Sequence, residues 1–270
     1  MAAQEHEQRI AMGLARRAYL YGVYRVVFGG GLDAEGVSGV FSQETAAALQ
    51  GIEEDLGAKE FACLASKELT AIRISVVDCI RENIACVEKT MGRGRDERFA
   101  ESLVDGHAML FRVPSDSYVK PWESPYVGTK AMMFQESTLD VRRRYHEAGF
   151  KLTAERHFPD DHIGAIMDYE ARMSSRVYEA YADGRDAEAR ALLASQRSML
   201  EAHVFTWIDG FVEEVAKKDG SAIFAAFAFG MDAFCRFDAE FCRDLEADFV
   251  NEEDDASPIG QGDGLPLDEK

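Results

Sequence analysis

The chain has 270 residues, of which 47% are hydrophobic and 29% charged, so its composition is that of a folded globular protein and excludes wholesale disorder. A formal net charge of −19 disfavours nucleic acid and anionic lipid as partners and favours a cationic one. No apolar run reaches the ~20 residues that cross a bilayer, and the acidic, polar start of the sequence does not resemble an export signal. We therefore expect a cytoplasmic protein.

The cysteines indicate a reducing compartment. There are five of them, an odd number, and none forms a CxxC pair, which argues against a disulfide scaffold or a zinc ribbon. Cys79 and Cys86 are seven residues apart, as are Cys235 and Cys242, so each pair shares one helical face. We interpret these thiols as small apolar side chains of a core.

Helical periodicity runs through the first half of the chain, and no segment shows the alternation of a strand. We predict helices over residues 5–28, 42–56, 58–91 and 96–111. Gly29 to Gly31 end the first helix, Ser42 is a suitable N-cap for the second, and the glycines after Met91 stop the third. The glycine-rich stretch from Gly36 to Gly39 is interpreted as a turn.

The helical periodicity stops at residues 113–128, where three prolines alternate with aromatic side chains. This pattern predicts an ordered, extended loop. Further helices are predicted over residues 131–148, 159–181, 186–218 and 221–249. Pro159 suits the first turn of its helix. The acidic residues 251–270 predict a disordered tail. The predicted fold is therefore all-α, a single multi-helix bundle domain over residues 1–250 followed by this tail.

No motif for catalysis is present. None of the six histidines follows a glutamate by three residues, as a di-metal carboxylate site requires, and HExxH is missing. The glycine-rich segments lack the Lys-Ser/Thr of a phosphate loop, and Gly36-Val37-Ser38-Gly39 lacks the spacing of a nucleophile elbow. We expect no catalytic residue, no metal site and no cofactor.

One polar cluster remains, the run from Pro159 to His162 at the start of a predicted helix. Its two aspartates could simply accept backbone N–H bonds as helix caps. The helix face that follows is rich in isoleucine and methionine and contains Glu170. Such a face is usually core, but an acid among methionines could also bind a cation at the end of an adaptable apolar groove.

Three motifs lie in a characteristic order: MLFRVP at residues 109–114, KPWESPY at 120–126 and PDDHIG at 159–164. With RRRYHEAG at 142–149 before the last of them, this order resembles the TorD/DmsD family, chaperones dedicated to molybdopterin oxidoreductases. The resemblance covers about the central quarter of the chain strongly, and the flanking helices agree in class and length.

The resemblance implies an all-α fold, no catalysis, and binding of the twin-arginine signal peptide of a reductase of the dimethyl sulfoxide or trimethylamine N-oxide type before export. Family members also hold the apo-subunit while its molybdenum cofactor is inserted. The positions that match the family's peptide-binding residues are Phe111, Pro121, Trp122, Pro159, Asp161 and His162.

A leader with two arginines and an apolar segment needs carboxylates beside an apolar groove, because guanidinium binds carboxylate bidentately and apolar burial contributes about 25 cal/mol per Å². We expect Asp161, with Asp160 and Glu123, to meet the arginines. His162 would orient these carboxylates, donate to the peptide, or only make a helix-start hydrogen bond. The apolar part of the groove is expected to be lined by Phe111, Trp122 and Tyr126.

The chain departs from the family pattern at two places. Phe158 stands where relatives often have an acid, and Ile166 stands where another acid often follows the histidine by one turn. The acidic tail is a further difference. Two alternatives remain open: an assembly chaperone that grips the mature part of a nitrate-reductase-like subunit, and a small-molecule-binding helical enzyme. A homodimer with exchanged elements is also open.

Overall fold

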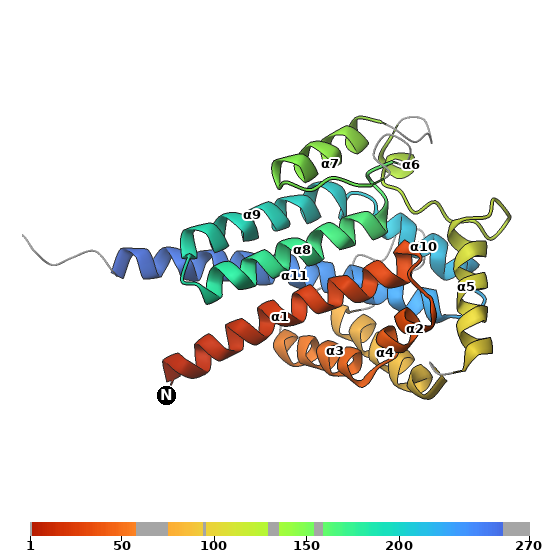
Figure 1. Cartoon of the computed structure of the whole chain (residues 1–270), viewed down its shortest axis with the longest axis horizontal. Helices are drawn as coiled ribbons and strands as arrows, with labels where there is room; N and C mark the ends of the chain where they lie inside the picture. Colours follow the sequence, from red (N-terminus) through yellow and green to blue (C-terminus); the bar gives the residue numbers. More distant parts are fainter. Residues whose placement is uncertain (1, 58–74, 94–95, 129–134, 154–158, 256–270) are drawn as a thin grey trace, which may run out of the picture.

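The computed structural model describes residues 2–57, 75–93, 96–128, 135–153 and 159–255, and its regular elements within them are helices (Figure 1). Trp122 and His162 form an isolated β-bridge. The all-α prediction is confirmed. None of these helices is long and apolar enough to cross a membrane. The elements are α1 (Ala2–Gly29), α2 (Ala34–Val40), α3 (Gln43–Leu56), α4 (Val76–Thr90), the 3-10 turn η1 (Met91–Arg93), α5 (Glu97–Phe111), α6 (Ser124–Val127), α7 (Glu136–Glu147), α8 (Ile163–Ala182), α9 (Asp186–His203), α10 (Ile208–Lys218) and α11 (Ile223–Asp255).

The long helices α1, α8, α9 and α11 lie roughly along the long axis of the molecule (Figure 1). Helix α1 packs along α8, α8 packs on α9, and α11 contacts α4, α9 and α10. Helices α3 and α4 pair on one side, α6 and α7 lie at the opposite edge, and α5 stands across one end (Figure 1). The C-terminal end of α1 and the N-terminal end of α8 both lie toward the end that carries α5.

Several helix boundaries follow from local capping. Ser42 accepts the backbone N–H of Thr45 at 3.1 Å, which confirms it as the cap of α3. Asp96 caps α5 in the same way. The described part of the predicted third helix begins at Val76, and its residues 58–74 lie outside the described part of the chain.

Several predictions of local structure were wrong. The loop predicted over residues 113–128 contains the short helix α6, because Pro125 lies in its first turn, where the missing N–H costs no helical hydrogen bond. The glycine-rich stretch interpreted as a turn is α2, because Asp33 caps it at Gly36 and two buried valines, Val37 and Val40, hold it against the core. The predicted helix over residues 186–218 is two helices, α9 and α10, separated by residues 204–207. At the other end, α11 continues to Asp255, five residues into the predicted tail, whose remaining residues lie outside the described part.

The core contains a buried ion pair between the first and last long helices. Arg17 and Asp238 have no exposed side-chain surface, and Arg17 Nη2 donates to Asp238 Oδ2 at 3.1 Å and to Gln196 at 3.0 Å. Glu170 joins the same cluster, because Gln196 Nε2 donates to its carboxylate at 2.8 Å, and burial raises the pKa of Glu170 well above its usual range. The apolar face of α8 around Glu170 is therefore core.

The predicted interpretation of the cysteines also agrees with the structure as far as it is described. Cys79, Cys235 and Cys242 are buried free thiols, and Cys86 is partly buried. Cys79 and Cys235 belong to the main hydrophobic core, whereas Cys242 also accepts a hydrogen bond from Arg17 at 3.0 Å. Cys63 lies outside the described residues.

The crossing of α1 and α8 requires a glycine. A Cβ atom on Gly164 would lie 2.6 Å from the Cα atom of Gly29, a backbone contact that no side-chain movement relieves. We expect Gly164→Ala to lower the free energy of unfolding by about 2 kcal/mol in urea denaturation, because the two helix ends must separate. Gly22→Ala in α1 is the control: its Cβ meets no described atom within 4 Å, and alanine should stabilise the helix by up to ~1 kcal/mol. Equal effects of both changes would contradict the close approach.

Candidate functional site

Two segments far apart in the chain form an antiparallel β-bridge beside the C-terminal end of α1 and the N-terminal end of α8. Trp122 faces His162 across this bridge, and backbone hydrogen bonds of 2.9 and 3.1 Å connect residues 121–123 to residues 161–163. The Trp122 and His162 rings meet edge to face with centroids 5.4 Å apart. The motifs KPWESPY and PDDHIG are therefore one structural unit, and we refer to residues 121–123 and 161–163 as the bridge.

The two aspartates of PDDHIG are buried and form hydrogen bonds within the protein; Asp160 is 1% exposed and Asp161 is 0% exposed. Asp161 Oδ2 accepts the backbone N–H of Ser124 at 2.7 Å, at the start of α6. Asp160 pairs with Arg142 of α7, whose Nε donates to it at 2.9 Å. The aspartates thus connect the bridge to α6 and α7.

The interpretation of these aspartates as caps of the helix that follows was wrong. Helix α8 begins at Ile163 rather than at Pro159, and its cap is His162, whose Nδ1 accepts the backbone N–H of Gly164 at 3.0 Å. His162 directly precedes the helix and has the extended backbone conformation that an N-cap residue requires. The helix-start hydrogen bond considered for His162 is confirmed.

Glu123 is equally enclosed, with 2% of its surface exposed. Its carboxylate lies 2.9 Å from Nδ1 of His203, and Nε2 of His203 lies 2.8 Å from the carboxylate of Asp140 on α7. His203 is the last residue of α9, so the break that divides the predicted helix directs this imidazole to the bridge. Burial opposes the charged imidazole, but the hydrogen bonds to Glu123 and Asp140 prevail and raise the pKa of His203.

The raised pKa of His203 predicts a pH-dependent contribution to stability. A histidine whose folded pKa exceeds its unfolded value of ~6.5 stabilises the fold fully below that value, and the contribution is lost as the pH rises through the folded pKa. We expect His203→Gln to lower the free energy of unfolding by about 2 kcal/mol at pH 6 and by clearly less at pH 9. Urea denaturation at both pH values measures this. The exposed His146 supplies the control: His146→Gln should change stability little. A loss for His203→Gln that is the same at both pH values would refute the charged pairing.

A hollow of about 470 Å³ lies beside the bridge, where the ends of α1 and α5 meet the start of α8. We call it the bridge hollow. Four of the nine predicted binding residues line it: Phe111, Trp122, Pro159 and His162. Phe28 and Leu152 add apolar surface, and Ala165 and Asp168 of α8 form part of the wall.

The other five predicted residues do not line the bridge hollow. Pro121 is buried in the bridge. Tyr126 turns to the other side, where its ring packs against Trp207 with centroids 5.3 Å apart. Glu123, Asp160 and Asp161 face the protein partners described above, so they support the wall of the hollow. The role predicted for these three carboxylates, meeting two arginines, requires them to leave those partners and remains a prediction.

Sequence reasoning missed the contribution of α1. Gly29 to Gly31 were predicted only to end a helix, yet they line the bridge hollow. Gly30 has a φ of +88°, which favours glycine, and a Cβ atom there would lie 3.3 Å from the ring of His107. Three successive glycines are more than a helix end requires, and this excess was the available signal.

The bridge hollow is mainly apolar, and its charged lining is slightly cationic. Among the described residues, Arg25 and Arg112 line it together with one carboxylate, Asp168, which lies 3.6 Å from Arg25 and 3.0 Å from Arg172 of the next helical turn. Burial lowers the pKa of His162 to about 4, so this imidazole is neutral near pH 7. The hollow is therefore suited to apolar side chains and does not attract a cation.

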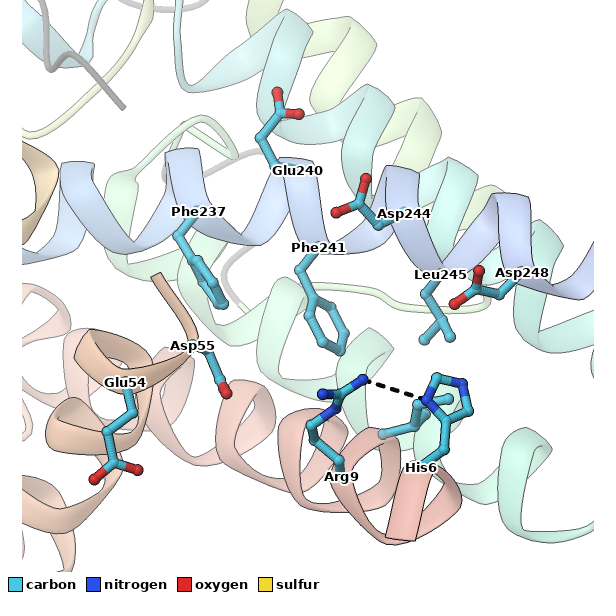
Figure 2. Close-up of a pocket in the computed structure, with 11 residues that line it drawn as sticks. His6, Arg9, Glu54, Asp55, Phe237, Glu240, Phe241, Asp244, Leu245 and Asp248 are labelled. Atoms are coloured by element: carbon cyan, nitrogen blue, oxygen red, sulfur yellow. Dashed lines mark hydrogen bonds between the residues drawn. The ribbon is translucent and has the colours of Figure 1, made fainter. Parts of the chain in front are cut away.

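A second hollow, of about 370 Å³, lies between α1, α3 and α11 (Figure 2). Figure 2 shows Phe237, Phe241 and Leu245 on one side and acidic side chains around them. Part of this acidic rim is neutralised, because Asp55 pairs with Arg16 and Glu240 pairs with Arg243. None of the predicted binding residues lines this hollow, so the bridge hollow is the candidate functional site.

Comparison with known proteins identifies similar chaperones and one matching family. The family described as "Nitrate reductase delta subunit" matches residues 80–213. The chaperone protein TorD of Photobacterium profundum is 23% identical over 147 residues, which are 54% of this chain and 66% of that protein. The Tat proofreading chaperone DmsD of Salmonella typhi is 27% identical over 126 residues, 47% of this chain and 55% of that protein. A probable DmsD of Haemophilus influenzae is 24% identical over 128 residues, 47% of this chain and 56% of that protein. The chain thus spans between about half and two thirds of the length of these relatives.

Proposed function

Because the chain belongs to the TorD/DmsD family, which consists of chaperones for molybdoenzyme maturation and not of enzymes, we propose that it binds the twin-arginine signal peptide of a molybdopterin oxidoreductase in the cytoplasm. The client is a reductase of the dimethyl sulfoxide or trimethylamine N-oxide type. The chaperone holds its apo catalytic subunit while the cofactor is inserted, before export.

The observation that carries this proposal is the composition of the bridge hollow. Motif residues more than 50 positions apart, from Phe111 to His162, line one cavity with a mainly apolar surface. A volume of about 470 Å³ lies within the range of ligand sites, and it accommodates a few apolar side chains of a leader peptide. Burying those side chains provides the binding energy, at about 25 cal/mol per Å² of apolar surface.

The charge of the protein supports a cationic leader as the ligand. A net charge of −19 accelerates the encounter with a basic peptide and makes the association sensitive to salt. The hollow then selects for the apolar segment that follows the basic residues. The negative surface thus attracts the basic leader, and the bridge hollow selects its apolar segment.

Filling the hollow tests this assignment without removing a core contact. Ala165 lies half-buried in the wall, so Ala165→Phe should occupy the cavity and weaken binding of an Arg-Arg leader peptide at least tenfold, because an apolar side chain of the ligand worth ~1.5–3 kcal/mol is excluded. Ala187→Phe on the exposed side of α9 is the matched control and should bind normally. Calorimetric titration gives both affinities, and the melting temperature of each variant shows whether it is folded. Unchanged affinity of a folded Ala165→Phe variant would refute the site.

The match to the family of nitrate reductase delta subunits favours a second candidate, a chaperone that grips the mature part of its client. Pull-down of the apo-subunit with and without its leader separates the two. Loss of capture on removal of the leader supports signal-peptide binding. Equal capture of both forms supports the second candidate.

A further inference from the structure

A third depression, distinct from the hollow of Figure 2, lies next to the bridge hollow along α5, and we call it the α5 groove. It has a volume of about 720 Å³ and lies between α5 and the chain segment that leads into α2. Its apolar surface comes from Leu32, Ala34, Ala100 and Val104, and Val104 is 45% exposed. It is therefore a shallow surface groove with an apolar base, open to a peptide.

The bridge hollow and the α5 groove are lined by consecutive stretches of the same two chain segments. Residues 29–31 and the C-terminal half of α5 line the bridge hollow, and residues 32–34 and the N-terminal half of α5 line the α5 groove. Met109, which is 46% exposed, lies one helical turn beyond Asp105 on the same face of α5. A ligand that follows α5 thus passes from one depression into the other over apolar surface.

Among the described residues that line the α5 groove, all charged side chains are acidic: Asp33, Asp96, Glu97, Glu101 and Asp105. Asp33 and Asp96 cap α2 and α5. Glu97, Glu101 and Asp105 are exposed, stand four residues apart on one helical face, and make no ion pair with any described residue. Glu97 lies in the first turn, where an acid suits the helix dipole, but like charges at this spacing destabilise a helix, so Glu101 and Asp105 do not benefit α5 itself.

The two linings divide the charges in a way that matches a two-part ligand. Among the described residues, the bridge hollow presents Arg25 and Arg112 against one carboxylate, Asp168, so a further arginine is not favoured there, and the carboxylates behind it are engaged with protein partners. The charged side chains that the described part of the α5 groove presents are carboxylates. A peptide with arginines at one end and apolar residues at the other matches the pair of depressions in one orientation only.

We propose, on the basis of the proposed function, that the arginine pair of the leader binds Glu97, Glu101 and Asp105 in the α5 groove while the apolar segment that follows enters the bridge hollow. The path along α5 from Glu97 to Phe111 is about 21 Å at 1.5 Å per residue. An extended peptide covers that distance with about six residues. The leader therefore runs along α5 from its N-terminal to its C-terminal end.

The test is a triple variant, Glu97→Gln/Glu101→Gln/Asp105→Asn, titrated with a synthetic leader peptide that carries two arginines before an apolar segment. We expect affinity about tenfold below that of the unchanged protein, because three exposed pairings are lost. The fold should persist, since these side chains are exposed and the substitutions relieve repulsion within α5. Binding to the unchanged protein should weaken with added salt more steeply than binding to the triple variant.

The control removes the same number of charges elsewhere: Glu54→Gln/Asp244→Asn/Asp248→Asn, at the hollow of Figure 2. It should bind the peptide with at most a twofold loss. Equal weakening by both triple variants would overturn the proposal, since the charge would then act at long range. Weakening by the control alone would also overturn it and would place the arginines at the other hollow.

A second peptide, with glutamines in place of both arginines, separates this proposal from the proposed function. It should bind the unchanged protein and the α5 triple variant with equal, reduced affinity, because the variant then lacks nothing that the peptide uses. If the arginine peptide does not bind the unchanged protein, the proposed function fails. If it binds but is insensitive to the α5 substitutions, the proposed function stands and the α5 groove is excluded.

Discussion

The site depends on how the proline-rich segment 113–128 satisfies its backbone hydrogen bonds. Three prolines keep most of this segment extended, with the short helix α6 near its end, so its buried polar groups need partners from other elements. The bridge supplies them, with the carboxylate of Asp161 on the backbone N–H of Ser124 as its most enclosed contact. Lys218 and the end of α5 bond to the backbone at Tyr118 and Val119. An extended segment is thereby held rigidly enough to form the wall of a cavity.

A buried charge network determines where that wall lies. Replacing a buried ion pair by apolar residues is often neutral for stability, so the pair between Arg17 and Asp238 is better understood through the geometry that it imposes. Arg17 bonds Asp238 of α11 and Gln196 of α9, and Gln196 in turn bonds Glu170 of α8. This chain of contacts fixes the position of α1 along its neighbours. One consequence is that the end of α1 meets the start of α8 at a pair of glycines, and the bridge hollow opens beside that crossing.

The sequence predicted most of the fold because its helices are long and their boundaries are local. Ser42 and Asp96 show this, since each cap is a side chain that bonds the backbone two or three residues further on. It failed where distant contacts override local preference. The glycine-rich α2 is helical because Val37 and Val40 are buried by other elements, and the break after His203 exists because the imidazole and Trp207 pack against α6 and α7.

The same limit explains which part of the site could be predicted. Pattern and resemblance identified Phe111, Trp122, Pro159 and His162, and the structure places them around one hollow. Residue type alone does not distinguish the enclosed Asp161 from the exposed Glu101, because a carboxylate is compatible with either position. Burial decides their chemistry, and burial depends on the tertiary arrangement. In the structure the motif carboxylates bond protein groups, and their predicted contact with the arginines of a ligand stays a prediction.

This division has a consequence for selectivity between clients. An enclosed carboxylate such as Asp161 or Glu123 holds the wall in the same way for every ligand, so it cannot distinguish one leader from another. Discrimination requires groups that a leader touches, and the charged ones are Arg25, Arg112 and Asp168 in the bridge hollow, with the acidic stripe on α5 beside it. Repulsion contributes as much to such a choice as attraction. Under the proposed function, a leader with a basic residue within its apolar segment would meet Arg25 and Arg112 in the hollow, whereas one whose basic residues precede that segment would not. The proposal therefore implies that the position of the charges along a leader matters more than their number.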